Sequence, residues 1–245
     1  MALKGATFDW WGTIARVPSH GDDAAMRELR IRRLDRTLRG HGIELDRSVL
    51  CDAYDRQGER LEDAWASQRE LDPEEQVHAF LRFAGIVSSD PWIPAAVADA
   101  FGAAILDRPP SLFPHIRETL GELKARGLAI GLISNTGRSW GRYLTKLQGV
   151  LGIQEYFDVR VYSDEQHSRK PDPRMFESAL AGLELKPAEV AHIGDDVAAD
   201  IAVAKAIGMR AVWFNTGFWP DATTDRADAE ISDHRDLPRV LEAWR

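Results

Sequence analysis

Leu128 to Thr136 reads LAIGLISNT, an unbroken apolar run that leads into a serine and an asparagine. The run follows Gly127, is shorter than most helices and ends in a polar turn, so it predicts a strand that is buried on both faces. Strands of this kind occur in parallel sheets whose two faces are covered by helices. The stretch therefore predicts an α/β fold.

Similar apolar segments lie on either side of this run and alternate with helical patterns. Further strands are predicted at residues 2–9, 159–162, 190–193 and 210–214, and helices at residues 115–127, 139–147, 173–183 and 197–207. Strands and helices that alternate in this way form parallel βαβ units. We predict a three-layer α/β sandwich with a mainly parallel, Rossmann-like sheet.

Residues 17–109 have a different texture. Long charged helical patterns fill this stretch, such as MRELRIRRLDRTLRG at Met26–Gly40 and CDAYDRQGERLEDAWASQRE at Cys51–Glu70, and no strand is predicted in it. The strand that precedes the stretch has the same buried character as those that follow it. We therefore predict an α/β core of residues 1–16 and 110–245 and a helical insert of residues 17–109.

The composition limits the class of partner. The chain has 245 residues, with 31 Lys and Arg against 39 Asp and Glu, and its net charge of −8 disfavours general binding to nucleic acid or to an anionic membrane. Cys51 is the only cysteine, and the N-terminus lacks the apolar segment of a signal peptide. We expect a cytoplasmic protein without disulfides, as a monomer or a homodimer.

Polar side chains follow the predicted strands at the point where ligands bind in parallel α/β sheets. The residues concerned are a carboxylate, a hydroxyl, an amide, an acidic pair and a loop lysine: Asp9, Ser134, Asn135, Asp195, Asp196 and Lys170. Carboxylates that meet at one edge need a cation, because they would otherwise repel each other and take up protons. Such oxygen ligands suit Mg²⁺, which shares phosphate oxygens with its substrates, and an aspartate beside a metal-held phosphate suits a covalent nucleophile.

Four motifs in this order resemble those of the haloacid dehalogenase superfamily of hydrolases, in the branch with a helical cap inserted after the first motif. They are FDWWGT at Phe8–Thr13, LISNT at Leu132–Thr136, RKPDPRMF at Arg169–Phe176 and HIGDDVAAD at His192–Asp200. The resemblance extends over the whole predicted core and implies that the insert is the cap.

The resemblance implies a catalytic role for three of these residues. Asp9 would attack the substrate and form an aspartyl intermediate, Ser134 would hydrogen-bond the transferred group, and Lys170 would neutralise charge on that group and on Asp9. Asn135 and Trp11 are predicted to line the substrate site beside them.

The resemblance also implies a metal site. Mg²⁺ would be held by Asp9, by Asp195 and by the backbone carbonyl of Trp11, with Asp196 as a further ligand. Asp200 would support the site from behind the ligands. The implied substrate is a small phosphorylated metabolite.

The first motif departs from the family pattern at one position. A second Asp normally stands two residues after the nucleophile and protonates the leaving oxygen, and here that position is Trp11. The backbone carbonyl is unaffected, but the proton donor is lost. General acid catalysis is commonly worth about 10²–10⁴-fold, so the loss matters most for an alkyl phosphate and least for an acyl phosphate, an aryl phosphate or a halide.

Three functions remain open after this departure: a metal-dependent phosphatase, a metal-independent 2-haloacid dehalogenase, and a weakly active or inactive relative that binds a phosphorylated ligand. Dehalogenases of the family also carry an aromatic residue at the position of Trp11, whereas GDD at Gly194–Asp196 resembles the metal-using branch. Phosphonoacetaldehyde hydrolases, which use a cap lysine, are excluded because no lysine lies between Trp10 and Arg108.

The predicted insert is rich in arginine along its first helix. The spacing predicts a solvated helix face, on which an inward-facing member could bind an anionic group of the substrate; the residues are Arg27, Arg30, Arg32, Arg33, Arg36 and Arg39.

Overall fold

The computed structural model describes residues 2–87 and 89–245, and the chain forms two compact units. The first unit contains the chain up to Val17 together with Pro110–Asn135 and Leu151–Arg245. The second unit contains Pro18–Pro109 and Thr136–Val150. The two units are described in turn.

A six-stranded parallel sheet forms the centre of the first unit, in the order β3-β2-β1-β4-β5-β6. Its strands are β1 (Gly5–Phe8), β2 (Ala129–Ser134), β3 (Val159–Tyr162), β4 (Val190–Gly194), β5 (Arg210–Phe214) and β6 (Ala229–Ile231). Strand β1 lies between β2 and β4, and all four of its residues are buried. A strand in this central position places the residue that follows it in the middle of the carboxyl edge of the sheet.

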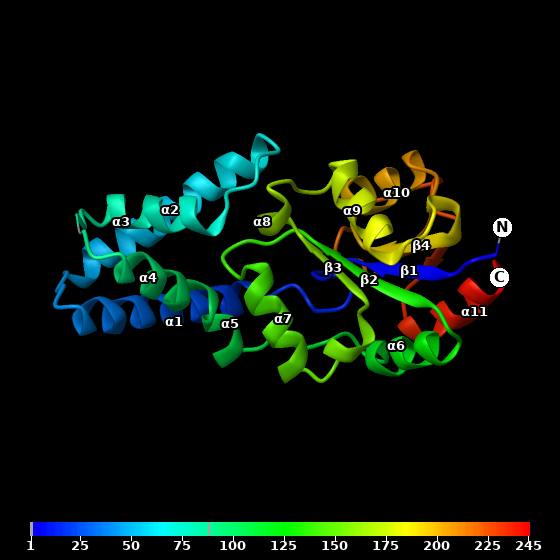
Figure 1. Cartoon of the computed structure of the whole chain (residues 1–245), viewed down its shortest axis with the longest axis horizontal. Coiled ribbons are helices and arrows are strands. Elements are labelled where there is room, and N and C mark those ends of the chain that lie inside the picture. The colour runs from blue at the N-terminus through cyan, green and yellow to red at the C-terminus, as the bar shows by residue number, and fades with distance from the viewer. Residues whose placement is uncertain (1, 88) are drawn as a thin grey trace. The chain divides into compact units, whose positions relative to one another are not determined.

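Helices cover both faces of this sheet (Figure 1). Helices α9 (Pro173–Leu183) and α10 (Ala202–Ala206) lie on one face, and α6 (Ile116–Ala125) and α11 (Leu237–Glu242) lie on the other. Shorter turns connect these elements: α8 (Ser163–Gln166), η1 (Gln154–Tyr156), η2 (Pro187–Glu189), η3 (Val197–Ile201) and η4 (His234–Asp236). The three-layer α/β fold predicted from the sequence is confirmed.

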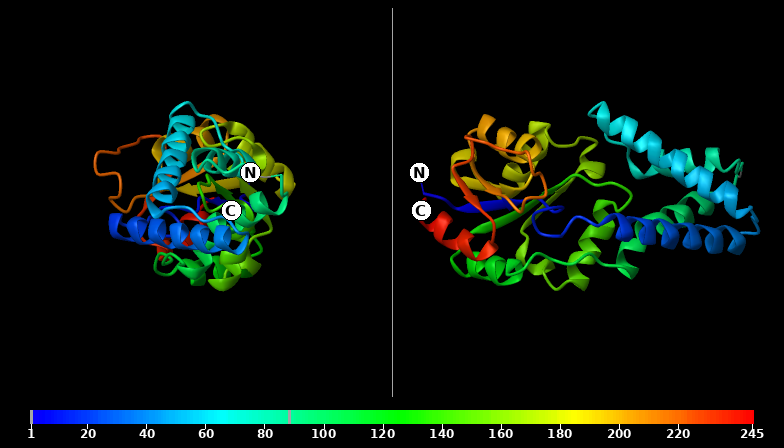
Figure 2. Two further views of the ribbon diagram at one scale, coloured as in Figure 1. Left: turned by 90° about the vertical axis from the view of Figure 1, so that its left-hand side faces the viewer. Right: turned by 180° about the vertical axis from the view of Figure 1, so that it is seen from behind.

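The regular elements among the described residues of the second unit are all helices, joined by turns and loops, and the blue and cyan segments of Figure 2 show the first of them. Its helices are α1 (His20–Gly40), α2 (Arg47–Ala66), α3 (Pro73–Phe83), α4 (Trp92–Gly102), α5 (Ala104–Asp107) and α7 (Gly141–Val150). Capping boxes begin α1 at Ser19 and α3 at Asp72, where a side-chain oxygen satisfies a free N–H of the first turn. None of the helices that the structure describes has the length and apolar character needed to cross a bilayer.

The structural division differs from the predicted boundaries at residues 136–150. The sequence assigned this segment to the core because it follows a core strand, but its helix α7 packs against α5 in the second unit. Tyr143 of α7 donates a hydrogen bond to Asp99 of α4, and its ring occupies the space where Gly102 has no Cβ. Local pattern predicts such a helix correctly but does not indicate which neighbour will cover it.

A buried histidine, His234, packs against strand β5 in the first unit. His234 donates from Nε2 to the carbonyl oxygen of Thr13 at 2.8 Å, and its ring stacks on Phe214 with centroids 4.2 Å apart. Burial lowers the pKa of His234 to about 4. The folded protein therefore holds this ring in its neutral form at neutral pH.

We expect His234 to make stability sensitive to mild acid. The unfolded chain takes up a proton near pH 6.5, whereas the folded chain does so only near pH 4, so the unfolding free energy falls as the pH drops through this window, by at most about 3 kcal/mol. His234→Gln keeps a donor and cannot titrate. Urea unfolding from pH 7 to 4.5 should show the wild type losing its advantage over this variant.

The matched control is His78→Gln, because His78 is exposed on α3. It shows what the loss of a solvent-facing imidazole does in the same pH series. A stability difference between the wild type and His234→Gln that does not change with pH would contradict the neutral buried ring.

Candidate active site

The site is centred on Asp9, the residue that follows β1. Its N–H donates to the carbonyl oxygen of Ile193 at 2.9 Å, which continues the pairing of β1 with β4 for one residue beyond the strand. The carboxylate is buried, and burial raises the pKa of Asp9 well above its usual range even though Lys170 lowers it. An uncharged neighbourhood would thus favour the protonated acid, and a cation is needed to keep Asp9 ionised.

Lys170 supplies one such cation. Its Nζ lies 2.5 Å from Oδ1 of Asp9 and 2.6 Å from Oδ1 of Asp200, and all three side chains are buried. Burial alone would lower the pKa of Lys170, but the two carboxylates outweigh it and raise the pKa. The ammonium group is therefore permanently charged and bridges two carboxylates that approach it from different elements.

Asn135 fixes the main chain at the lysine. Its Nδ2 donates to the carbonyl oxygen of Lys170 at 3.1 Å, and its Oδ1 accepts the N–H of Lys170 at 2.8 Å. The sequence predicted a substrate-lining role for Asn135, and the geometry gives its amide a positioning role. Ser134, the last residue of β2, is buried, and its Oγ contacts the carbonyl oxygen of Asn135 at 3.2 Å.

Asp200 enters the site from a widened helical turn. The N–H of Ile201 bonds to the carbonyl oxygen of Asp196, five residues earlier, so η3 is a turn of π-helix where the sequence predicted a regular helix. Such turns recur at functional sites because they redirect a side chain. Here Asp196 caps the turn through Oδ1, which accepts the N–H groups of Ala198 and Ala199.

A second layer of hydrogen bonds holds Asp200 in place. Nε2 of His192 lies 3.2 Å from Oδ1 of Asp200, and Nδ1 of His192 lies 2.9 Å from Oγ1 of Thr7. Burial lowers the pKa of His192, which favours the neutral ring. With Nε2 protonated, His192 donates to Asp200 and accepts from Thr7, so that all three polar groups are satisfied.

Asp195 follows β4 and is held from three directions. Its Oδ1 accepts from Oγ1 of Thr13 at 3.2 Å, its Oδ2 accepts from Nε1 of Trp219 at 3.0 Å, and its carbonyl oxygen accepts from Nε1 of Trp213 at 3.0 Å. Burial and the charge of Asp200 raise the pKa of Asp195 to about 6. The orienting bonds fix the carboxylate without supplying a full positive charge.

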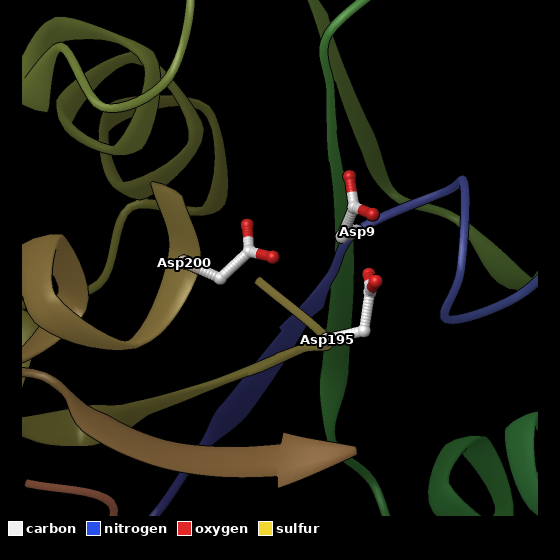
Figure 3. Close-up of side chains that lie close together, drawn as sticks. All are labelled: Asp9, Asp195 and Asp200. Atoms are coloured by element: carbon white, nitrogen blue, oxygen red, sulfur yellow. The ribbon is translucent and has the colours of Figure 1, made fainter. Parts of the chain in front are cut away.

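The three carboxylates converge. One oxygen each of Asp9, Asp195 and Asp200 lies within 4.8 Å of the other two, and Figure 3 shows the side chains directed toward a common space. All three are buried, and Lys170 is the cation in contact with Asp9 and Asp200. Oxygen donors at this spacing, with raised pKa values at two of them, fit a hard divalent cation such as Mg²⁺.

Two other predicted residues lie outside this convergence. Asp196 is not among the three carboxylates, because its Oδ1 caps the π-helical turn. Trp11 is half-buried and meets the ring of Trp10 edge-on, with centroids 6.2 Å apart. Its backbone lies in the tight turn between Asp9 and Thr13.

Several supporting residues were missed at the level of sequence. Thr13, His192 and Trp219 all touch an acidic side chain of the site. Thr13 lies in the motif FDWWGT and His192 in the motif HIGDDVAAD, so their place in these motifs could have marked them as site residues. Trp219 lies in a loop after β5 with no pattern that marks it.

The family of the chain follows from comparison with known proteins. A family model described as haloacid dehalogenase-like hydrolase matches residues 3–208, and the chain belongs to this family of hydrolases. The 2-haloacid dehalogenase of Pseudomonas syringae pv. Tomato, a solved structure, has a TM-score of 0.66 at 24% identity and covers 99% of this chain and 100% of its own. At that identity the likeness concerns the fold.

Curated relatives of the chain include phosphatases. The ribulose-1,5-bisphosphate 5-phosphatase of Halopiger xanaduensis is 38% identical over 142 residues, which are 57% of this chain and 58% of the relative. The phosphoserine phosphatase of Thermus thermophilus is 34% identical over 126 residues, 51% of this chain and 49% of the relative. The chain thus matches about half the length of these relatives.

Gly12 allows the tight turn to pass beside Asp195. Its φ is +80°, and a Cβ there would lie 2.3–2.6 Å from the carboxylate of Asp195. Gly217 offers a matched comparison, because its φ is +75° but a Cβ there would meet nothing within 4 Å.

We expect Gly12→Ala to destabilise the protein by about 3 kcal/mol or more, and Gly217→Ala by about 1 kcal/mol. Both variants strain the backbone, but Gly12→Ala also forces the carboxylate of Asp195 to move. Urea unfolding at pH 7 measures both losses. Equal losses would contradict the close approach of the turn to Asp195.

Proposed function

We propose that this hydrolase is a Mg²⁺-dependent phosphatase that transfers a phosphoryl group from a small phosphorylated metabolite to Asp9 and then to water. The observation that carries the proposal is the buried convergence of Asp9, Asp195 and Asp200 beside Lys170. The phosphatase relatives support the same class of reaction. We further propose that the second unit is the cap of this enzyme.

In this mechanism each residue acts through its position. Asp9 attacks phosphorus, Lys170 neutralises charge on Asp9 and on the transferred group, and the hydroxyl of Ser134 hydrogen-bonds a phosphoryl oxygen. Asn135 keeps Lys170 in reach through the two bonds to its main chain.

The proposed ion would be held by Asp9, Asp195 and the carbonyl oxygen of Trp11, with Asp196 retained as a predicted further ligand. When bound, Mg²⁺ supplies positive charge that offsets charge on the phosphoryl oxygens. It would also favour the ionised forms of Asp9 and Asp195, whose pKa values are raised by burial.

The substrate class follows from the missing proton donor. Trp11 cannot protonate a leaving oxygen, so the mechanism suits phosphates whose leaving group is already a good one. Acyl and aryl phosphates meet this condition better than alkyl phosphates.

A metal-independent dehalogenase is the second candidate, and the observation that favours it is the aromatic Trp11 two residues after Asp9. Against it stands the convergence of three buried carboxylates, because a site that works without a cation gains nothing from their mutual repulsion. Release of chloride from 2-chloropropionate without Mg²⁺ would support this candidate.

We expect Asp9→Asn to abolish the hydrolysis of 4-nitrophenyl phosphate and acetyl phosphate, with a loss on the order of 10⁴-fold or more. Wild-type turnover should require Mg²⁺ and should cease with a chelator. The measurement is the steady-state rate of product release with and without Mg²⁺.

The matched control is Asp228→Asn, which removes a carboxylate paired with Lys205 near the start of β5. It should retain activity. Full activity of Asp9→Asn would overturn the mechanism, and turnover independent of added or bound metal would overturn the cofactor assignment.

We expect Trp11→Asp to raise kcat/KM toward alkyl phosphates by about 10²-fold, because it restores a carboxylic acid beside the leaving oxygen. Trp11→Phe, which removes bulk without adding an acid, is the control and should give no such gain. Hydrolysis of ethyl phosphate provides the measurement. No gain in Trp11→Asp would mean that the turn does not direct this side chain at the leaving group.

A further inference from the structure

The loop that follows β5 places an indole ring against the carboxylates of the first unit. Nε1 of Trp219 donates to Oδ2 of Asp195 at 3.0 Å, although Trp219 is 47% exposed and Asp195 is buried. A tryptophan normally lies with most of its ring away from water. Burial of apolar surface therefore does not account for the position of this ring, and the hydrogen bond to the buried acid is its specific contact.

The main chain of this loop is held on both sides of the indole. The N–H of Asn215 donates to the carbonyl oxygen of Ile231 in β6 at 2.8 Å, and Oδ1 of Asn215 accepts the N–H of Gly217 at 3.1 Å. Beyond the indole, the N–H of Ala222 donates to the carbonyl oxygen of Trp219 at 3.0 Å. None of these bonds uses the side chain of Trp219, so the indole can be replaced without removing them.

Phe218 places the same loop beside the tight turn that follows β1. Its ring meets that of Trp219 edge-on, with centroids 5.0 Å apart, and it lines a cavity of about 250 Å³ together with Gly12 and Phe113. Gly12 passes directly beside the carboxylate of Asp195. The loop after β5 and the turn after β1 therefore both border this acid.

Each oxygen of the Asp195 carboxylate accepts a hydrogen bond from a different neutral donor. Oγ1 of Thr13 donates to Oδ1 at 3.2 Å, and Nε1 of Trp219 donates to Oδ2. Nε1 of Trp213 holds the main chain of the same residue by donating to its carbonyl oxygen at 3.0 Å. Rotation of the carboxylate about its Cβ–Cγ bond would stretch or break these bonds, so the carboxylate keeps one orientation.

A carboxylate of fixed orientation discriminates between divalent cations. Mg²⁺ demands a near-ideal octahedron of oxygens at about 2.0–2.1 Å, whereas Ca²⁺ accepts about six to eight oxygens in a flexible arrangement and often takes both oxygens of one carboxylate. A ligand that is held in advance favours the ion with the strict geometry. A carboxylate that is free to turn costs Mg²⁺ more than it costs Ca²⁺.

We propose that Trp219 is a positioning residue that holds Asp195 in the orientation required by Mg²⁺ and thereby favours Mg²⁺ over Ca²⁺. This proposal rests on the metal site of the proposed function. Trp219 acts through the orientation of Asp195 and takes no part in phosphoryl transfer. Removal of its N–H leaves Oδ2 of Asp195 without this donor, while the donor from Thr13 stays.

The test compares the binding of Mg²⁺ and of Ca²⁺ in the wild type and in Trp219→Phe, which keeps an aromatic ring and removes the N–H. Titration of the chelator-treated, ¹⁵N-labelled protein, followed by NMR at pH 7.5, gives the dissociation constants of both ions. Asp195, whose pKa is about 6, is ionised at this pH. We expect Mg²⁺ to bind about tenfold more weakly in the variant and Ca²⁺ to lose less, so that the ratio of the two affinities falls severalfold.

The indole N–H provides a readout that a merely structural role would not move. The chain has eight tryptophans, and the signal of Trp219 is the indole signal that is absent from the spectrum of Trp219→Phe. In the wild type we expect this proton to exchange slowly with water although the residue is half exposed, and its signal to shift when Mg²⁺ is added. Rapid exchange, or a signal that Mg²⁺ does not move, would overturn the proposal from the wild type alone.

Trp92→Phe is the matched control, because it makes the same substitution at a tryptophan of α4 that is 72% exposed in the second unit. It should keep both dissociation constants of the wild type. Circular dichroism checks that the two variants are folded.

The outcomes separate this inference from the phosphatase. Equal losses for the two cations in Trp219→Phe, or no loss for either, would overturn the role of Trp219 and leave the phosphatase standing. A preference for Mg²⁺ that depends on Trp219 would stand even if the wild type hydrolysed neither acetyl phosphate nor 4-nitrophenyl phosphate. A wild type that binds no Mg²⁺ would overturn the metal site and this inference together.

Discussion

The contact of Lys170 with Asp9 and Asp200 is the interaction on which the site depends. Carboxylates packed together away from water repel each other, and one ammonium group bonded to two of them at 2.5 and 2.6 Å makes their burial possible. Asp9 comes from the end of the central strand and Asp200 from a π-helical turn, so the lysine joins elements that the sheet alone does not connect. The parallel sheet supplies the location, and the charge balance supplies the reason why these side chains stay there.

That balance is incomplete without a further cation. Burial raises the pKa values of Asp9 and Asp195, whereas Lys170 and His192 outweigh burial at Asp200 and lower its pKa.

The strands and the order of the motifs were predictable from the sequence because buried parallel strands are apolar throughout and their ends are polar. Strand β6 was missed because it has three residues and only Ile231 is buried. The π-helical turn was not predictable. Sequence periodicity does not distinguish the backbone hydrogen bond from Ile201 to the residue five positions earlier from the four-residue bond of a regular α-helix. The same turn brings Asp200 into the carboxylate group, whereas the sequence favoured its neighbour Asp196. The packing of α7 against α5 joins segments that are distant in the sequence, and the local sequence pattern does not indicate it.

Asn135 carries a restriction that is independent of any substrate. A carboxamide offers one donor and one acceptor side by side, and the peptide groups at Lys170 use both. An aspartate in its place would leave the carbonyl without a donor, and a serine would be too short to serve both groups. Substitutions that change the specificity of this enzyme can therefore affect the residues around Asn135 and Lys170. The side-chain amide of Asn135 itself must be preserved to hold Lys170 in position.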